Sequence, residues 1–170
     1  SWTSTTGQTS TFDICIGTPP PPPSNDEPCG AIALTVNSTC IGTTGSVGSA
    51  TNSGIDACFG TPDNDVWYSF VATNTSQTVS LFNVFGSTTD MYHAVYGSFT
   101  QPDCSVAVAD NISCNDSDST DLTGLTVGAT YFVQVFTYFS GSATTTFEIC
   151  VTEPCTLSGS IANTPTLCPT

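Results

Sequence analysis

Residues 63–72 (DNDVWYSFVA) join a carboxylate cluster to a run in which two sets of apolar residues alternate. Val66, Tyr68 and Phe70 occupy every second position, and Trp67 and Val71 belong to the positions between them. A period of two residues is typical of a β-strand. Because both sets contain large side chains, we predict a strand with one face in a sandwich core and the other face partly covered.

The same alternation recurs along the chain and predicts an all-β protein. Seven further segments are expected to be strands: residues 31–36, 78–85, 90–97, 105–109, 111–114, 131–138 and 147–151. Residues 43–54 are too poor in large side chains to be more than a loop or a weak edge strand, and residues 115–121 are polar and acidic. No window has a convincing 3.6-residue period. The pattern therefore predicts a two-sheet β-sandwich or jelly roll.

Two short motifs occur twice. Residues 12–16 (FDICI) match residues 147–151 (FEICV), and residues 27–29 (EPC) return as residues 153–155. This internal repeat predicts a window through a tandem array. Residues 1–17 would be the last strand of a preceding module or a donor strand, 18–23 a polyproline linker, 24–152 one complete module, and 153–170 the start of the next module or a C-terminal extension. The alternative, that the ends are ordinary terminal strands resembling each other because strands do, stays open.

The charge composition excludes several classes of partner. The chain has 14 acidic residues, no lysine or arginine and one histidine, which gives a formal charge of −14. Without internal cations the carboxylates depend on water, neutral donors or metal ions. Nucleic acids and anionic lipid surfaces are excluded as partners because both require lysine or arginine. No run approaches about 20 unbroken apolar residues, so we expect no membrane insertion.

Nine cysteines without a CxxC pair predict a disulfide framework in an extracellular or cell-surface protein. Cys104 and Cys114 flank a short predicted hairpin and form the pair best supported by spacing. The remaining predicted pairs are Cys40 with Cys58, Cys29 with Cys150, and Cys155 with Cys168. Cys15, which matches Cys150 by repeat position, is left to find its partner in a preceding module.

Three segments, in this order, resemble the bacterial pre-peptidase C-terminal domain in the disulfide-bearing form of secreted and surface adhesin repeats of Bacteroidetes. They are residues 65–70 (DVWYSF), 89–97 (TDMYHAVYG) and 125–135 (LTVGATYFVQV), and residues 25–29 (NDEPC) resemble the start of that form. The sequence departs from the family at Gln134, where an arginine is common. The resemblance implies an extracellular β-sandwich that is often repeated, acts as an accessory or binding domain, and in some relatives holds calcium near the N-terminal linker. It does not imply catalysis.

Two acidic clusters are candidate calcium sites because their ligands would be the hard oxygens that calcium prefers. The first combines two segments, Asn25, Asp26 and Glu27 with Asp63, Asn64 and Asp65. The second, weaker one contains Asp116, Asp118 and Asp121. Solvated turns are the alternative for both clusters, because aspartate and asparagine favour turns.

The residues present do not support catalysis. No lysine or arginine is available, and neither a G-x-S-x-G elbow nor an HExxH helix occurs. His93, the single imidazole, alternates with Met91 and Val95 and is predicted to be a half-buried structural residue. Four asparagines begin N-x-S/T triplets, and Ser119 lies in a DST motif resembling the O-glycosylation motif of Bacteroidetes; a chain so rich in serine and threonine is expected to contain such motifs by composition. The asparagines are Asn37, Asn74, Asn111 and Asn115.

The sequence leaves two functions open. The first is a non-catalytic structural repeat of an extracellular adhesin or filament, whose partners are copies of itself or adjacent modules. In this role Phe12, Ile14, Cys15 and Ile16 would contact the neighbouring module, in one variant by strand donation. The second is an accessory module of a secreted hydrolase that binds carbohydrate or a protein or surface ligand through exposed aromatics, with Trp2, Tyr92 and Phe139 as candidates.

Overall fold

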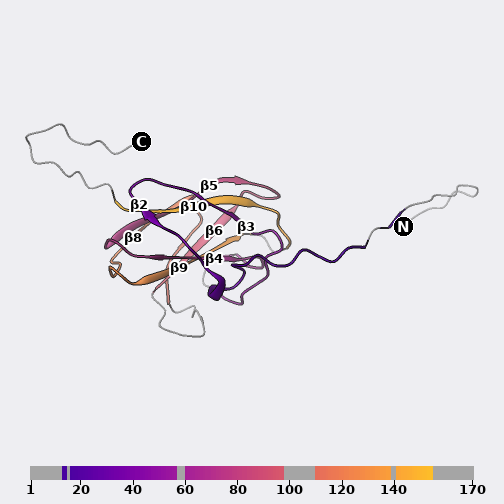
Figure 1. The fold of residues 1–170 in the computed structure, drawn as a ribbon, viewed down its shortest axis with the longest axis horizontal. Coiled ribbons are helices and arrows are strands. Elements are labelled where there is room, and N and C mark those ends of the chain that lie inside the picture. Colours follow the sequence, from indigo (N-terminus) through magenta and orange to yellow (C-terminus); the bar gives the residue numbers. More distant parts are fainter. Residues whose placement is uncertain (1–12, 15, 57–59, 98–109, 139–140, 155–170) are drawn as a thin grey trace, which may run out of the picture.

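The structure is a computed structural model that describes residues 13–14, 16–56, 60–97, 110–138 and 141–154. Two β-sheets pack against each other (Figure 1). One main hydrophobic core fills the space between them. One helical element is described in full, the short 3-10 turn η1 (Pro28–Gly30). The all-β, disulfide-stapled sandwich predicted from the sequence is therefore confirmed. No helix in the described part of the chain is long and apolar enough to cross a bilayer.

The first sheet contains five strands in the order β1-β4-β9-β6-β7. Their bounds are β1 (Ile32–Ala33), β4 (Val66–Val71), β9 (Thr130–Thr137), β6 (Met91–Tyr96) and β7 (Asn111–Asn115). The two-residue strand β1 pairs parallel to β4, and the other neighbours are antiparallel.

The second sheet has the order β2-β10-β5-β8, with β3 also pairing with β10. Its strands are β2 (Val36–Asn37), β3 (Thr43–Ser46), β5 (Ser76–Phe85), β8 (Ser119–Thr123) and β10 (Thr146–Thr152). Strand β2 runs parallel to β10, whereas β3 and β5 run antiparallel to it.

Alternating side chains of both sheets fill the space between them. Tyr68 of β4 meets Phe147 of β10 edge to face across the core, with ring centroids 6.1 Å apart. Strand β3 passes close to this pair, and a Cβ at Gly45 would lie 2.1 Å from the Tyr68 hydroxyl, so β3 needs its glycine there. The other face of β4 is covered too, because Trp67 is fully buried in a second cluster with Ala94 and Tyr96. Both predicted properties of this strand are confirmed.

Two predicted elements differ from the structure. Residues 31–36 form two short strands in different sheets, because the chain crosses between the sheets at Leu34, which is buried and donates its backbone N–H to Ser69 (2.7 Å). The polar, acidic segment 115–121, which was not assigned to a strand, contains the start of strand β8. Ser119, Asp121 and Thr123 face solvent, while Thr120 and Leu122 point inward.

The chain joins and leaves the sandwich at opposite ends (Figure 1). It arrives beside the start of β4, where the Trp67 N–H donates to the Asn25 carbonyl (2.8 Å). It leaves after β10, where the Glu153 N–H donates to the Asn37 carbonyl (2.9 Å) and the Thr73 hydroxyl donates to the Glu153 carboxylate (2.6 Å). Thr73 follows the end of β4 and Glu153 follows the end of β10, so their contact means that both strands end on the same side of the sandwich. The entry at the start of β4 and the exit after β10 therefore lie at opposite ends of the strands.

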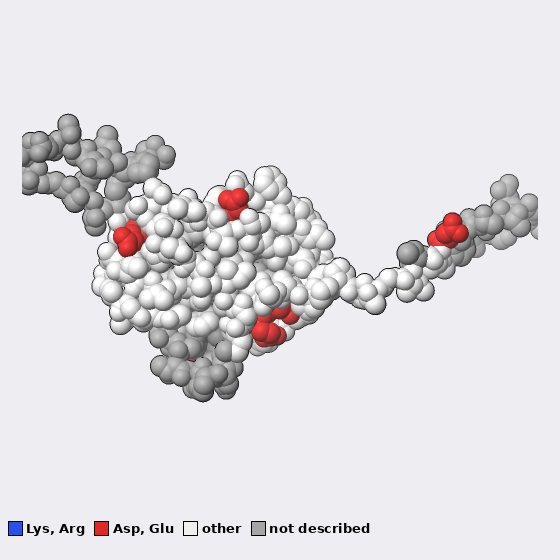
Figure 2. Space-filling view, viewed as in Figure 1, with Lys and Arg blue, Asp and Glu red and all other residues white. Residues whose placement is uncertain are grey.

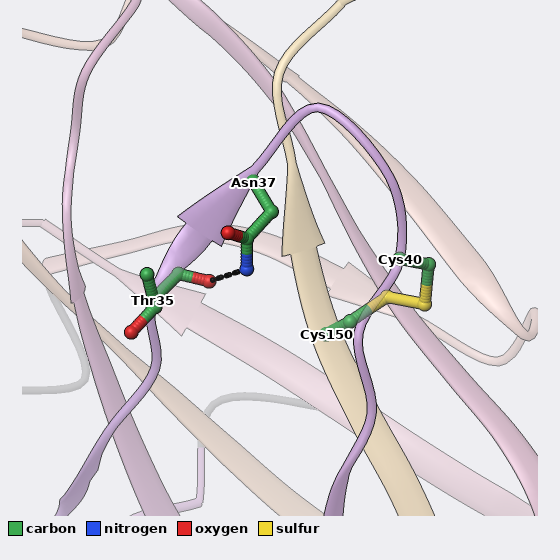
Figure 3. The surroundings of a disulfide bond; sticks show 4 residues. All are labelled: Thr35, Asn37, Cys40 and Cys150. Atoms are coloured by element: carbon green, nitrogen blue, oxygen red, sulfur yellow. Dashed lines mark hydrogen bonds between the residues drawn. A yellow bond between two sulfur atoms is a disulfide. The ribbon is translucent and has the colours of Figure 1, made fainter.

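A disulfide joins Cys40 to Cys150 (Figure 3). The predicted pairs Cys40–Cys58 and Cys29–Cys150 are therefore wrong. Cys40 lies between β2 and β3, and both strands pair with β10, so the fold brings it beside Cys150 although 110 residues separate them. Figure 3 also shows the Asn37 side chain donating to the Thr35 carbonyl (3.1 Å) in the same turn.

Cys29 and Cys114 are disulfide-bonded as well. The predicted partner of Cys114, Cys104, lies outside the described residues, as do both members of the predicted pair Cys155 and Cys168. Those two pairs stay predictions.

Candidate functional site

The first predicted calcium cluster lies where the linker meets the sandwich. Residues 25–27 precede η1, and residues 63–65 lead into β4. Asn25 ties the two segments together, because its side-chain amide donates to the Trp67 carbonyl (3.1 Å). Burial raises the pKa of the Glu27 carboxyl, and the negative charges of Asp26 and Asp65 raise it further. The fold therefore brings these carboxylates near enough to repel one another.

Neutral donors of the chain already occupy many of the cluster's oxygens. Both oxygens of Asp26 accept hydrogen bonds from Thr51, one from the N–H and one from the hydroxyl, each 2.6 Å long. The Asn64 side-chain oxygen accepts from the Thr137 hydroxyl (3.0 Å). Asp63 is exposed and accepts one long bond, 3.3 Å, from the Asn52 amide. Among the described residues, no three His, Cys, Asp or Glu side chains are placed to hold a metal ion.

Calcium therefore stays a proposal for Asp26, Glu27 and Asp63, and a comparison of salts tests it. We expect NaCl to raise the melting temperature, because the chain has 14 acidic residues and no cation of its own, so added salt screens its repulsion. Calcium binding requires a further rise in CaCl2 at equal ionic strength that EDTA reverses. It also requires the double variant Glu27→Gln/Asp63→Asn to lose this extra rise. Equal melting temperatures in the two salts would contradict a site.

Asp65 belongs to a buried polar cluster on the outer side of the first sheet. Its carboxylate accepts hydrogen bonds from the Ser53 N–H (2.9 Å), the Ser53 hydroxyl (2.5 Å), the Trp67 indole (2.9 Å) and the Gln134 amide (2.8 Å). Burial raises the pKa of Asp65, and the bonds from Ser53 and Gln134 partly oppose that shift. Four neutral donors thus solvate a carboxylate that has no cation.

Gln134 connects this cluster to its surroundings. Its amide also donates to the Ile55 carbonyl (2.9 Å), and its side-chain oxygen accepts from the Tyr96 hydroxyl (2.6 Å). Sequence reasoning marked Gln134 as a departure from arginine but did not identify its partner. The register of β4 and β9, which places Trp67 opposite Gln134, brings the amide to Asp65.

The second predicted calcium cluster is spread over a turn and a strand. The Asn115 side chain accepts from the Ser117 N–H (2.9 Å), which closes the turn. Asp121 lies on β8 and accepts from the Thr78 hydroxyl of β5 (2.6 Å), whereas the exposed Asp118 contributes its backbone carbonyl to Leu81 (2.7 Å). Asp116 is exposed in the turn. The three carboxylates are thus spread over a turn and a strand, and calcium binding by Asp116, Asp118 and Asp121 stays a prediction.

The predicted glycosylation residues differ in exposure. Ser119 is exposed at the start of β8, whereas the four asparagines, Asn37, Asn74, Asn111 and Asn115, are half-buried. Modification of any of them stays a prediction.

His93 is more deeply buried than predicted. Its ring has no exposed surface, and Nε2 lies 2.7 Å from the Thr120 hydroxyl of the opposite sheet, while Nδ1 has no hydrogen-bond partner. Burial lowers the pKa of His93 to about 4, and the negative charge of Asp118 opposes this only in part. The imidazole is therefore neutral at physiological pH and forms part of the core.

We predict that the burial of His93 lowers the free energy of unfolding in acid. The unfolded state takes up a proton near the ordinary pKa of 6.5, whereas the folded state resists it until about pH 4. We therefore expect the His93 contribution to fall by about 3 kcal/mol as the pH drops between these values. Denaturant unfolding of the wild type and of His93→Gln at several pH values measures it. Asp65 and Glu27 have raised pKa values and gain stability in acid, so the difference between the two proteins isolates His93. A pH-independent difference would contradict the assignment.

Tyr92 is not the exposed aromatic that the sequence suggested. It is 9% exposed and stacks between Phe136 and Tyr138, with ring centroids 5.9 and 5.3 Å away. The prediction was wrong because the face of β6 expected to meet solvent is covered. Trp2 and Phe139 lie outside the described residues.

No protein-family model matches the sequence, and no curated protein matches it. A solved structure with a similar chain path is the periplasmic inhibitor of g-type lysozyme, PliG, from Aeromonas hydrophila. The two chains are 14% identical and superpose with a TM-score of 0.40 over 71% of this chain and 95% of that one. A likeness of that size carries no conclusion about the fold or function of this chain.

Proposed function

We propose that the chain is a non-catalytic structural repeat of an extracellular surface adhesin or filament, whose sandwiches are joined in tandem or by strand donation. The observation that carries this proposal is a contrast between two similar segments. Ile149 and Val151 of β10 are fully buried, whereas Ile14 and Ile16, which match them in the repeat, are 69% and 91% exposed. Phe12 and Cys15 of that segment lie outside the described residues.

The exposed isoleucines have a physical reason to find another sheet. Burying one isoleucine side chain contributes about 1.5–3 kcal/mol, so docking both would contribute several kcal/mol. A segment with the sequence of β10 fits the place that β10 occupies, between β5 on one side and β2 and β3 on the other. Because β10 itself fills that place in a complete sandwich, the segment would belong to a neighbouring sandwich that has no β10 of its own.

The cysteine pattern supports the same proposal. By the repeat, Cys15 corresponds to Cys150 and Cys168 to Cys40, and Cys40 bonds to Cys150. The terminal cysteines would then bond to neighbouring modules, Cys15 to one before and Cys168 to one after. This proposal departs from the predicted Cys155–Cys168 pair, which would correspond to a Cys29–Cys40 pair, whereas Cys40 bonds to Cys150.

The disulfides, the acidic surface and the buried histidine are each consistent with an extracellular, non-catalytic protein. Disulfides persist in oxidising compartments, which favours an extracellular location. Figure 2 shows separate acidic side chains and no basic ones on the visible face, which would keep neighbouring fibres apart by repulsion. The single imidazole is buried and neutral, which favours a role without catalysis. The alternative, an accessory module that binds carbohydrate or protein, is no longer supported by Tyr92, because the Tyr92 ring is buried.

Disulfide mapping of the native material tests the proposal directly. The chain has no tryptic site, so cleavage at acidic residues and mass spectrometry would be used. We expect Cys15 to be bonded to a cysteine that occupies the Cys40 position of another module. Electron microscopy should show sandwiches in a row, about 50–55 Å apart across the proline linker. A free Cys15 together with dispersed monomers would refute the proposal.

A charged substitution tests the contribution of the isoleucines. We expect Ile14→Asp/Ile16→Asp to reduce assembly into fibres at least tenfold, because docking would bury two unpaired carboxylates. Sedimentation and electron microscopy measure assembly. The matched control is Ile41→Asp/Val127→Asp, which alters two comparably exposed apolar residues of the sandwich and should leave assembly unchanged. Equal assembly by both variants would contradict docking of the segment.

A further inference from the structure

The chain enters and leaves the sandwich at opposite ends, an arrangement that allows the sandwich to transmit tension. The chain joins at the start of β4 and leaves at the end of β10, so a pull on its two ends is directed along the strands (Figure 1). Residues 25–40 run the length of the sandwich, first along β4 as β1 and then along β10 as β2. This segment is the part of the module that a pull from the N-terminal side loads first.

The loaded strands at the exit are parallel. Val36 pairs with Val151 and Asn37 with Thr152. When β2 is pulled towards its N-terminal end and β10 towards its C-terminal end, the two strands slide in opposite directions along their axes. The hydrogen bonds between them lie across the direction of force and must break together, not one after another.

The Cys40–Cys150 disulfide lies next to this pair. It offers a covalent path from residue 25 along the backbone to Cys40, across to Cys150 and out at Glu153. Residues 41–149, which include β3 to β9 and most of the core, lie outside this path. Any further disulfide, including that of Cys29, can only shorten the path.

We propose that the Cys40–Cys150 disulfide makes the module nearly inextensible, so that tension passes along residues 25–40 and 150–153 while the remaining sandwich is shielded. The biological setting of this inference rests on the proposed function, because a fibre or adhesin under flow would be pulled end to end. The mechanical property belongs to one chain and is measured without assembly.

The path lengths give the expected extensions. Residues 25–40 and 150–153 contain about 18 peptide links, which extend to about 7 nm, whereas residues 25–153 extend to about 46 nm. A domain of this size is about 4 nm across. Unfolding should therefore release no more than about 3–4 nm with the disulfide intact and about 40 nm after complete reduction, a difference of roughly tenfold.

Single-molecule pulling on the full 170-residue chain, held at both termini, tests this. The oxidised wild type should give a short step of no more than about 4 nm, and adding a reductant under force should release the remaining length. The oxidised Cys40→Ala/Cys150→Ala variant should give steps at least fivefold longer in total. A step of tens of nanometres from the oxidised wild type would overturn the inference.

A short step from both the wild type and the variant would also overturn it, because another cross-link would then carry the tension. The wild type alone, compared before and after reduction, keeps the test decisive if the variant does not fold. Failure of the proposed function would show instead as absent assembly, whatever the pulling result.

Discussion

Replacing Cys40 and Cys150 with alanine is expected to lower the free energy of unfolding by about 4–5 kcal/mol. The disulfide closes a loop of 110 residues, and a cross-link over so long a loop removes much of the conformational freedom of the unfolded chain. Alanine is the suitable replacement because Cys150 is buried and a serine hydroxyl there would need a partner. Urea unfolding followed by tryptophan fluorescence measures the change.

Two controls separate the cross-link from local packing. Ile41→Ala removes an exposed neighbour of Cys40 and should change the unfolding free energy by less than about 0.5 kcal/mol. The wild type in reductant should approach the stability of the double variant or fall below it, because its other disulfides are reduced too. A double variant within about 1 kcal/mol of the oxidised wild type would show that the disulfide adds little to a core that already holds the strands together.

The strands predicted well from the sequence are those in which large apolar residues alternate with other residues and the apolar ones are buried. In β4, β9 and β10 large side chains point into the core at every second position, so the pattern marks both the strand and its inner face. Strand β8 was missed because only Thr120 and Leu122 point inward, and aspartates around them are typical of turns. A short edge strand carries too few apolar residues to stand out.

The disulfide pairs were harder to predict because they depend on which strands lie side by side. Cys40 was expected to bond to Cys58, but β2 and β3 both lie beside β10 and place Cys40 next to Cys150. The role of Gln134 required the same kind of information. The sequence shows that glutamine stands where the similar family commonly has arginine. The hydrogen bond from Gln134 to Asp65, however, depends on the register between β4 and β9.

The chain replaces cations with neutral donors. Hydroxyl groups of Thr51, Ser53, Thr73 and Thr78 donate to the carboxylates of Asp26, Asp65, Glu153 and Asp121. Most of these pairs lie near the surface, where water can assist. Asp65 is the exception because it is fully buried, so its donors must come from the protein alone.

Gln134→Leu is therefore expected to destabilise the protein by about 3–5 kcal/mol. Leucine has nearly the same volume but cannot donate to the buried Asp65 carboxylate or the Ile55 carbonyl, nor accept from the Tyr96 hydroxyl. Removing one partner of a buried group costs the full desolvation of the group left behind, and the cost is larger when that group is charged. Denaturant unfolding at pH 7 measures the loss.

Gln77→Leu is the matched control. Gln77 is equally buried, but its amide makes one bond, to the Thr73 hydroxyl (2.7 Å), and its side-chain oxygen has no partner. Its replacement should cost no more than about 1 kcal/mol, because removing an unpaired buried oxygen offsets the lost bond.

The pH dependence of Gln134→Leu distinguishes a lost donor from poor packing. Losing the Gln134 donor raises the pKa of Asp65 further, so the folded variant takes up a proton more readily than the folded wild type. By linkage, part of the lost stability should return as the pH falls and Asp65 becomes neutral. A gap between wild type and variant that stays constant from pH 7 to the acid range would mean that the leucine packs badly. The Asp65 charge would then not be what Gln134 stabilises.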